Sequence, residues 1–459
     1  MLAGGNGGKS MYSVLDYGAV ADGKTLCREA FQAAVDACAA AGGGTVLVPA
    51  GTYLLGTVVM RSHVYVCLEA GATILGSTDF EHDYLPHEPV TPPCYQDISH
   101  TYFDHSLFVC KECCDIGFYG HGCIDMQGVW LPEKLPMHGY GTYRTVKVFA
   151  LRSCCDVSFS DLTVLRATDL CLWMYDCERV RIHALSLDVL VDGISPDACR
   201  DVVISDCLVK ADDDAIVLKS SFTLGRRIAC EHIAISNCVI SSNSNAIKLG
   251  TETNGDFRNI TVTGCVIKDT HMAGITVQSV DGAHVSGILF SNITMDNVAV
   301  PIFLRLGARL RGPEGTEMGS ISNVMIQNVF ARFPMREYAT TPIHLPGERN
   351  AGTTNIPFEY PSMIVGMSDR PIENVTLSDV TLVTYGGKSL EDALPMPLPE
   401  KENAYPNPNM FGPRKLLPVS GLLMRHVRGI KLRNVTMRTL HPDTRPLTLF
   451  EDAEDICIE

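Results

Sequence analysis

Tryptophan, charged residues and long apolar segments are all scarce in this 459-residue sequence. It contains two tryptophans, and only 19% of its residues are charged. No run of about 18 apolar residues occurs, so we expect no membrane-spanning helix. Basic residues are also fewer than acidic ones: the sequence has 37 lysines and arginines against 52 acidic residues, a formal charge of −15. Nucleic acids and anionic membranes require a basic surface, so neither is expected as a partner.

The N-terminal segment and the cysteines bear on the cellular compartment. The opening MLAGGNGGKSMYSVLDYGAV has no basic segment followed by an apolar one, so we expect no secretory signal and predict a cytoplasmic protein. Many of the 18 cysteines lie in apolar segments such as VYVCLEA and ISNCVI, where a free thiol packs as a small hydrophobe. We therefore expect nearly all of them to be free. Cys110, Cys113 and Cys114 form one cluster, but no second CxxC completes a zinc site, so no metal or other cofactor is predicted.

A four-residue unit recurs nine times, as an apolar residue, any residue, usually Asp, Asn or Gly, and a second apolar residue. The closest spacing is 22 residues, and the other gaps are longer and irregular. Short strands with bends at this spacing indicate a solenoid with insertions. The units are FSDL 159–162, IHAL 182–185, ISDC 204–207, ISNC 235–238, VTGC 262–265, FSNI 290–293, IQNV 326–329, LSDV 377–380 and LRNV 432–435.

The repeat predicts an all-β fold, a right-handed parallel β-helix in which stacked repeats close one continuous core. A large β-sandwich has similar strand spacing but does not explain the recurring unit, and a leucine-rich repeat would need helices between strands. We predict one domain over 1–459, with a capping helix at 25–40 inside an N-terminal cap and first rung at 1–60. The Pro-rich text at 385–425 predicts a long loop excursion within the domain, among insertions gathered on one face.

Three aspartates are brought together by the repeat spacing. Asp192 precedes Asp213 and Asp214 by 21 and 22 residues, which places them on neighbouring rungs about 4.8 Å apart along the stack. Carboxylates this close cannot all ionise freely, and one raised and one low pKa supply the acid and the base of glycoside hydrolysis. A calcium site is the alternative for such a cluster. For Asp197 and its neighbours Asp201 and Asp206 we favour a structural role at bends.

The stretch VDGISPDACRDVVISDC, followed by DDDAIVLKS, resembles the NTDGIDPDSCRNVxIxNC and GDDAIALKS block of glycoside hydrolase family 28, the polygalacturonase-like β-helix hydrolases. DYGAVADGKT, GGGTVLVPAGTYLLG and GFYGHGCIDMQGVW resemble further segments of that family, and the resemblance spans about residues 12–450. It implies that Asp213 is the general acid, and that Asp192 and Asp214 hold and deprotonate the attacking water. It also implies inversion of configuration, whereas the short carboxylate spacing alone favours retention.

Two motifs of the family are missing from this chain. Ser244 stands where the family has the His of its GHG motif, and the GHG around His121 belongs to an earlier segment, where a turn is expected. Thr276 and Gln278 stand where the family has the two cations of RIK, which grip the substrate carboxylate. Without both cations, the reason for galacturonate specificity is lost, so we predict a neutral sugar or a differently placed carboxylate.

Seven further side chains are candidates for substrate binding. A Lys or Arg in a short apolar strand must face a pocket or pair with a carboxylate, and an ion pair between Lys248 and Asp214 is the structural alternative. His271, Tyr405 and Arg425 are expected to reach the site from loops. Trp130 and Trp173 are more simply explained by packing than by sugar stacking. The seven candidates are Lys219, Lys248, Glu252, His271, Gln278, Asp281 and Arg305.

The leading hypothesis is an exo-acting hydrolase of pectin-type or related plant-derived oligosaccharides. A lyase, an epimerase or a glycosyl transferase on the same scaffold is an alternative, and a lyase would depend on calcium and on Lys248 or Arg305. A non-catalytic glycan-binding solenoid is a third class. The sequence leaves the sugar, the linkage and a homo-oligomeric state open.

Overall fold

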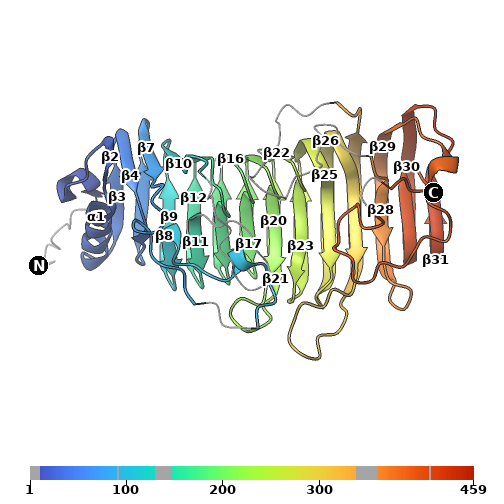
Figure 1. Cartoon of the computed structure of the whole chain (residues 1–459), viewed down its shortest axis with the longest axis horizontal. Coiled ribbons are helices and arrows are strands. Elements are labelled where there is room, and N and C mark those ends of the chain that lie inside the picture. The colour runs from blue at the N-terminus through green and yellow to red at the C-terminus, as the bar shows by residue number, and fades with distance from the viewer. Residues whose placement is uncertain (1–10, 90–92, 130–145, 337–358, 413–414) are drawn as a thin grey trace, which may run out of the picture.

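The protein was analysed as a computed structural model, which describes residues 11–89, 93–129, 146–336, 359–412 and 415–459. The chain winds into a stack of parallel strands, one rung above the next, with the two ends of the stack far apart (Figure 1). No helix in the described ranges is long and apolar enough to span a membrane.

Most strands fall into three columns. The first contains β1 (Met11–Ser13), β3 (Gly44–Val48), β6 (Val64–Leu68), β9 (Cys114–Tyr119), β12 (Cys155–Ser160), β15 (Glu178–His183), β18 (Arg200–Ser205), β21 (Cys230–Ser236) and β24 (Phe257–Thr263). The second contains β2 (Asp22–Leu26), β4 (Gly51–Leu55), β7 (Ala72–Gly76), β10 (Cys123–Asp125), β13 (Thr163–Leu165), β16 (Ser186–Val189), β19 (Leu208–Ala211) and β22 (Val239–Ser242). The third contains β5 (Val58–Val59), β8 (Ser106–Lys111), β11 (Lys147–Arg152), β14 (Leu172–Tyr175), β17 (Ile194–Asp197), β20 (Ile216–Ser220), β23 (Ile247–Thr253) and β28 (Ser362–Val365).

In the C-terminal rungs, long strands bend from one column into the next. They are β25 (Val266–Ser279), β26 (His284–Leu306), β27 (Ser320–Arg332), β29 (Ile372–Gly386), β30 (Leu422–His441) and β31 (Thr448–Ile458). The predicted parallel β-helix is therefore confirmed.

The recurring unit marks one position in every rung. Its first residues pair in register from Phe159 through Ile182, Ile204 and Ile235 to Leu432. The third residue has positive φ in all nine units, which explains why Asp, Asn or Gly usually stands there. The fourth residues lie in the interior; the predicted interior column of Leu185, Cys207 and Cys238 is buried.

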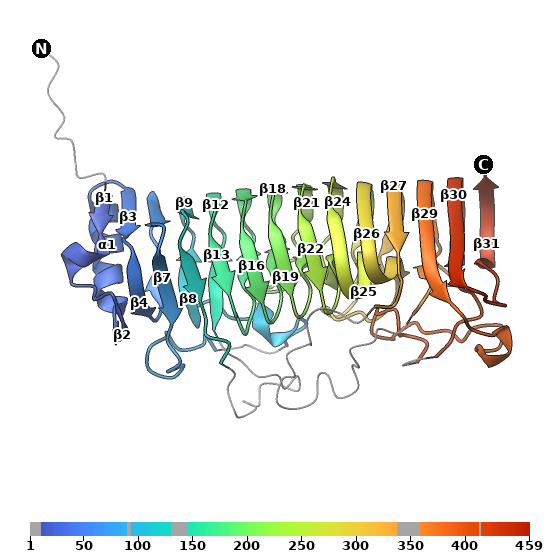
Figure 2. The same ribbon diagram turned by 90° about the horizontal axis from the view of Figure 1, so that it is seen from above.

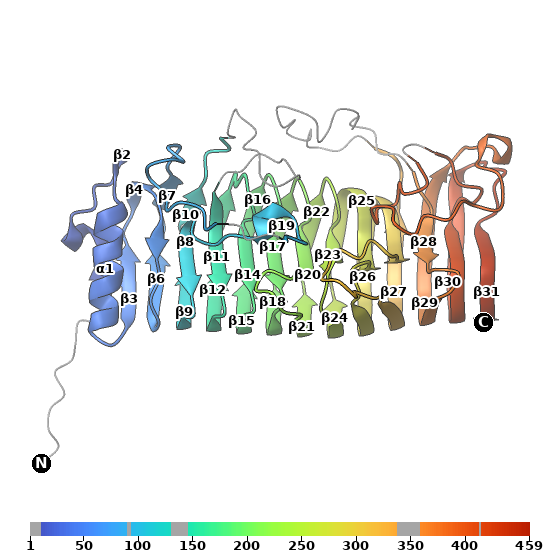
Figure 3. The same ribbon diagram turned by 60° about the horizontal axis from the view of Figure 1, so that its bottom comes forward.

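The N-terminal end of the stack is covered by α1 (Arg28–Ala40), close to the predicted helix (Figure 1). Its apolar face packs into the main core. The long connections gather on one side of the stack, as Figures 2 and 3 show. Among them is the segment between β29 and β30, of which residues 387–412 and 415–421 are described and contain only the short 3-10 helix η3 (Leu390–Asp392).

The expectation of almost exclusively free cysteines needs one correction. Sixteen cysteines are free, and most of these are buried, but Cys114 and Cys155 form a disulfide between the paired strands β9 and β12. Both belong to a CCD sequence, at 113–115 and at 154–156, and these sequences occupy equivalent positions in adjacent rungs. The inward-pointing Cys113 and Cys154 remain thiols, while the outer pair is joined.

Candidate active site

The candidate site lies on the outer face of the third column, at β17, β20 and β23. Side chains alternate along each of these strands. Ile194, Ile216 and Ile247 point into the core, and on each strand the neighbours of the core-facing residues point outward. The outward row contains Lys219 on β20 and Lys248 on β23, both at 4% exposure. Two buried lysines on one sheet face require acidic partners.

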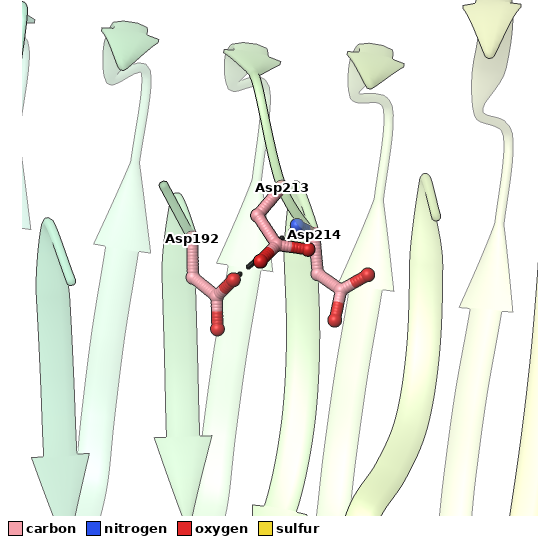
Figure 4. Close-up of side chains that lie close together, drawn as sticks. All are labelled: Asp192, Asp213 and Asp214. Carbon is pink, nitrogen blue, oxygen red and sulfur yellow. Dashed lines mark hydrogen bonds between the residues drawn. The ribbon is translucent and has the colours of Figure 1, made fainter. Parts of the chain in front are cut away.

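The three predicted aspartates converge just before β17 and β20. One carboxylate oxygen from each of Asp192, Asp213 and Asp214 lies within 4.8 Å of the others. The backbone N–H of Asp214 donates to Oδ1 of Asp192 at 3.3 Å, which ties the neighbouring rungs together (Figure 4). Asp192 and Asp214 are buried, and Asp213 is partly exposed. Asp213 is therefore the member of this trio most accessible from solvent.

Asp214 is held as a carboxylate. Its Oδ2 accepts from Nζ of Lys248 at 2.7 Å, and its Oδ1 accepts from the amide Nδ2 of Asn245 at 2.7 Å. Burial alone would raise its pKa, but the charges of Lys248 and Lys219 with these hydrogen bonds outweigh burial and lower it. The ion pair between Lys248 and Asp214, which was the structural alternative for this lysine, is thus observed.

Asp192 has the opposite tendency. Burial raises its pKa to about 8, and the charges of Asp213 and Asp214 add to this effect. Lys219 opposes it, with Nζ 3.6 Å from Oδ2 of Asp192 and 3.1 Å from Oε2 of Glu252. The pKa of Glu252 lies well below its usual range, since the charges of Lys219 and Arg309 outweigh its burial. The trio therefore combines a carboxyl that keeps its proton near neutral pH with one that stays ionised.

The three carboxylates are close enough to hold a cation. Two of them, however, already have ammonium partners in Lys219 and Lys248, which supply the compensating positive charge. The donor set therefore fits an acid–base site at least as well as a metal site.

The positions of the missing cations are filled by buried neutral side chains. The hydroxyl of Thr276 donates to Oδ1 of Asn245 at 3.1 Å. The amide Nε2 of Gln278 donates to the carbonyl oxygen of Pro406 at 2.6 Å. Both side chains serve the protein's own packing, and neither carries charge.

The other candidates lie further from the trio. Asp281 follows β25 and forms an ion pair with Arg309, and burial raises its pKa. His271 was expected on a loop but lies within β25, one rung after Ser244, and burial lowers its pKa to about 4. The guanidinium of Arg305 donates to the carbonyl oxygens of Gly366 and Lys401. These hydrogen bonds go to the backbone and not to a carboxylate.

Several secondary expectations also have outcomes. Tyr405 lies in the predicted excursion, and its hydroxyl lies 3.2 Å from that of Thr251 on β23. Arg425 was expected on a loop but lies buried in β30, where it donates to the carbonyl oxygen of Pro399. Trp173 is fully buried and stacks on Phe103 with ring centroids 4.4 Å apart, as the packing interpretation predicts.

The remaining expectations concern residues for which no catalytic role was predicted. His121 is an exposed residue at a bend, and Trp130 lies outside the described residues. Asp206 has positive φ at a bend, as expected. Asp201 also has positive φ but lies within β18, and Asp197 lies buried within β17, where it accepts from the backbone N–H of Ser221 at 2.8 Å.

Sequence reasoning missed three side chains at the site. Asn245 follows Ser244 and binds Asp214. Arg309 binds Asp281 and donates to the carbonyl oxygen of Thr251 at 2.8 Å. His100, in the 3-10 helix η2 (Ile98–His100), is carried to the site by the connection between β7 and β8. The two loop residues lie in text with no periodic pattern, whereas the repeat spacing of 31 residues from Asp214 could have identified Asn245.

Connections cover the sheet on both sides of the trio. On the N-terminal side, Phe103 stacks on Trp173 of β14, and Nζ of Lys147 donates to the carbonyl oxygen of Tyr102 at 3.1 Å. On the C-terminal side, the excursion is held by Gln278, Arg305 and Arg425 through the carbonyl oxygens of residues 406, 401 and 399. Strands β17 and β20 lie between these two covers, and Tyr405 of the excursion reaches Thr251 of β23.

Comparison with known proteins gives a consistent result. Residues 38–391 match the sequence profile of the family described as "Glycosyl hydrolases family 28". A probable polygalacturonase from Vitis vinifera is 29% identical over 226 residues, a match that spans 46% of this chain and 44% of the plant protein.

Two solved structures share the fold. An exopolygalacturonase from Thermotoga maritima superposes with a TM-score of 0.68 at 19% identity, over 93% of this chain and 91% of that one. A family 28 exopolygalacturonase from Yersinia enterocolitica gives a TM-score of 0.71 at 19% identity, over 97% and 78%.

Proposed function

We propose that this chain, which belongs to the glycosyl hydrolases of family 28, hydrolyses pectin-type or related plant-derived oligosaccharides from a chain end. The observation that carries the proposal is the trio, in which a buried carboxyl with a pKa raised to about 8 lies beside a carboxylate held ionised by Lys248. This pairing of a proton donor with a base is what the cleavage of a glycosidic bond requires.

In this proposal Asp213 is the general acid. It is the partly exposed member of the trio, so it is the one that reaches the leaving oxygen of a bound substrate. Asp192 keeps one proton in the trio near neutral pH, and because its carboxyl lies within 4.8 Å of that of Asp213, a single bridging water passes the proton to Asp213. Asp192 and Asp214 then hold and deprotonate the attacking water. The proton from water returns to the trio, so the site is restored after each turnover.

The stereochemical outcome is proposed to be inversion, in line with the family pattern of the aspartates. The separation of at most 4.8 Å is shorter than the roughly 6.5–9.5 Å typical of inverting pairs, and distance alone would favour retention. Proton NMR of the first-formed anomer decides between the two outcomes, since an inverted product appears before mutarotation.

The exo mode is supported by the two covers. The contact of Phe103 with Trp173 lies on β14 and the contact of Gln278 with Pro406 lies on β25, four strand spacings apart, a length of about 19 Å at a strand spacing of ~4.8 Å. A chain end fits such a length, whereas a polymer would have to cross both covers. We extend the proposal to an intracellular compartment, where imported fragments are the available substrate; the sixteen free thiols support this location, whereas the disulfide between Cys114 and Cys155 argues against a strongly reducing one.

The test is a product screen by mass spectrometry on end-labelled pectic and other plant oligosaccharides, with Asp213→Asn as the blank. Release of single units from one end supports the proposal. Unsaturated products would indicate a lyase, and the absence of any turnover would favour a glycan-binding solenoid.

A further inference from the structure

His100 has an unusual environment for a histidine. It is 4% exposed, and among the described residues neither of its ring nitrogens has a hydrogen-bond partner. Its ring meets Trp173 edge-on with centroids 5.7 Å apart, and its carbonyl oxygen accepts from the hydroxyl of Thr223 at 2.7 Å. The side chain is therefore fixed in place while its polar atoms are left without partners, which is costly unless something else binds them.

Two more buried polar atoms on the same sheet face share this state. The hydroxyl of Ser195 and the Oε1 atom of Glu252 have no hydrogen-bond partner among the residues that the structure describes. Ser195 pairs in register with Trp173, the residue under the ring of His100. Glu252 interacts electrostatically with His100 and is bound through its other oxygen to Lys219, which also approaches Asp192. The three groups thus lie on the same sheet face as the trio, on the side where Phe103 covers Trp173.

We propose that His100, Ser195 and Glu252 form a subsite for the hydroxyl groups of a neutral sugar ring. This inference rests on the proposed function and names the substrate class at one position of that site. A neutral imidazole offers one donor and one acceptor, a serine hydroxyl offers both, and Oε1 of Glu252 accepts. Adjacent hydroxyls of a sugar each donate and accept, so they match this set.

A carboxylate on the same ring would be disfavoured. Glu252, whose pKa lies well below its usual range, places negative charge in this region, and Lys219 is already bound to it. Burial, with the charge of Lys219, lowers the pKa of His100, so the imidazole supplies no positive charge to a uronate. The subsite therefore selects hydroxyl groups over a carboxylate.

The test uses galactose and galacturonic acid, which differ only at C6. Their binding to the intact protein is measured by calorimetry, with the imidazole resonances of His100 followed by NMR. The variants are His100→Phe, which keeps packing against Trp173, His100→Gln, which restores a donor and an acceptor, and the control His121→Phe at an exposed bend.

We expect galactose to shift the His100 resonances and to bind at least about tenfold more tightly than galacturonic acid. His100→Phe should weaken galactose binding about fivefold, the scale of one neutral hydrogen bond. His100→Gln should recover most of that loss, and His121→Phe should show none. With a series of monodeoxygalactoses, the effect of His100→Phe should vanish for the analogue that lacks the contacted hydroxyl.

Equal galactose binding by His100→Phe with unshifted resonances would mean that only internal water occupies the site, and this overturns the inference. Preference for galacturonic acid overturns it as well. If sugars bind as expected but no oligosaccharide is cleaved, the subsite stands and the proposed hydrolase activity fails. If cleavage occurs but substitution of His100 has no effect on sugar binding, the proposed hydrolase activity stands and the subsite fails.

Discussion

The charge of Lys219 sets the pH range in which the proposed mechanism operates. Its Nζ atom lies 3.6 Å from Asp192, whose pKa burial raises to about 8 despite this neighbour. In the variant Lys219→Met the opposing charge is gone, so the pKa of Asp192 must rise further. At an effective dielectric constant of about 20, a pair at this distance interacts by ~4–5 kcal/mol, an upper bound of about three pKa units.

The assay is the pH dependence of kcat/KM, which reports the free enzyme. Activity of the unaltered protein should fall as pH rises through about 8, because the trio then loses the proton that the leaving oxygen needs. In Lys219→Met this alkaline limb should move up by one to three pH units. The acidic limb should move up too, since Lys219 also lowers the pKa of Asp214.

A matched control lies in the same rung. Lys210 on β19 pairs with Asp188 at 2.9 Å, with the two side chains 43% and 51% exposed, and a surface pair of this kind contributes about 0–1 kcal/mol. Lys210→Met should leave both limbs in place. Because Lys219→Met also leaves Glu252 buried without its cation, Lys219→Met combined with Glu252→Gln is measured in parallel. An alkaline limb that stays in place or moves to lower pH in both variants refutes the reasoning.

Four further predictions concern chemistry, specificity, redox state and the excursion. Asp213→Asn should lower kcat by at least ~10²-fold, with partial rescue by substrates carrying a good leaving group, whereas Asp192→Asn and Asp214→Asn should show no rescue; full activity of Asp213→Asn on a natural substrate contradicts the mechanism. Because Thr276 and Gln278 are neutral, oligosaccharides of neutral sugars should be cleaved faster than plain oligogalacturonides, and rapid turnover of the latter refutes this. Thiol titration of the denatured protein should find sixteen free thiols before reduction and eighteen after it, and several additional disulfides would contradict the structure. Arg425→Met should loosen the excursion by removing the hydrogen bond to the carbonyl oxygen of Pro399 and the ion pair with Glu400, so limited proteolysis within 394–412 should accelerate; unchanged cleavage would show that the remaining contacts, among them the hydrogen bonds from Gln278 and Arg305, are enough to hold it.

The fold was predictable because its rules are local. Strand alternation decides which side chains enter the core, and positive φ at the third residue of each unit favours Asp, Asn or Gly. The same spacing brought Asp192 to Asp214, since one rung without an insertion has 22 residues. The disulfide follows the same logic: the CCD sequences at 113–115 and 154–156 are one rung apart, but an insertion separates their cysteines by 41 residues and conceals the equivalence. The division into a single domain stays a prediction.

The partners of the trio were harder to predict because they come from two kinds of source. Lys248 and Lys219 lie on the strands themselves, so alternation predicts that they face outward, and their choice of carboxylate then follows from burial. His100 and Arg309 come from connections whose sequence has no period, and their positions depend on contacts such as the ion pair between Asp97 and Arg311, 214 residues apart. The rungs thus supply the acid–base groups at fixed spacing, while the connections supply the groups that would distinguish one sugar from another. Substrate preference can therefore change by loop substitution without disturbing the carboxylates that the rungs hold in place.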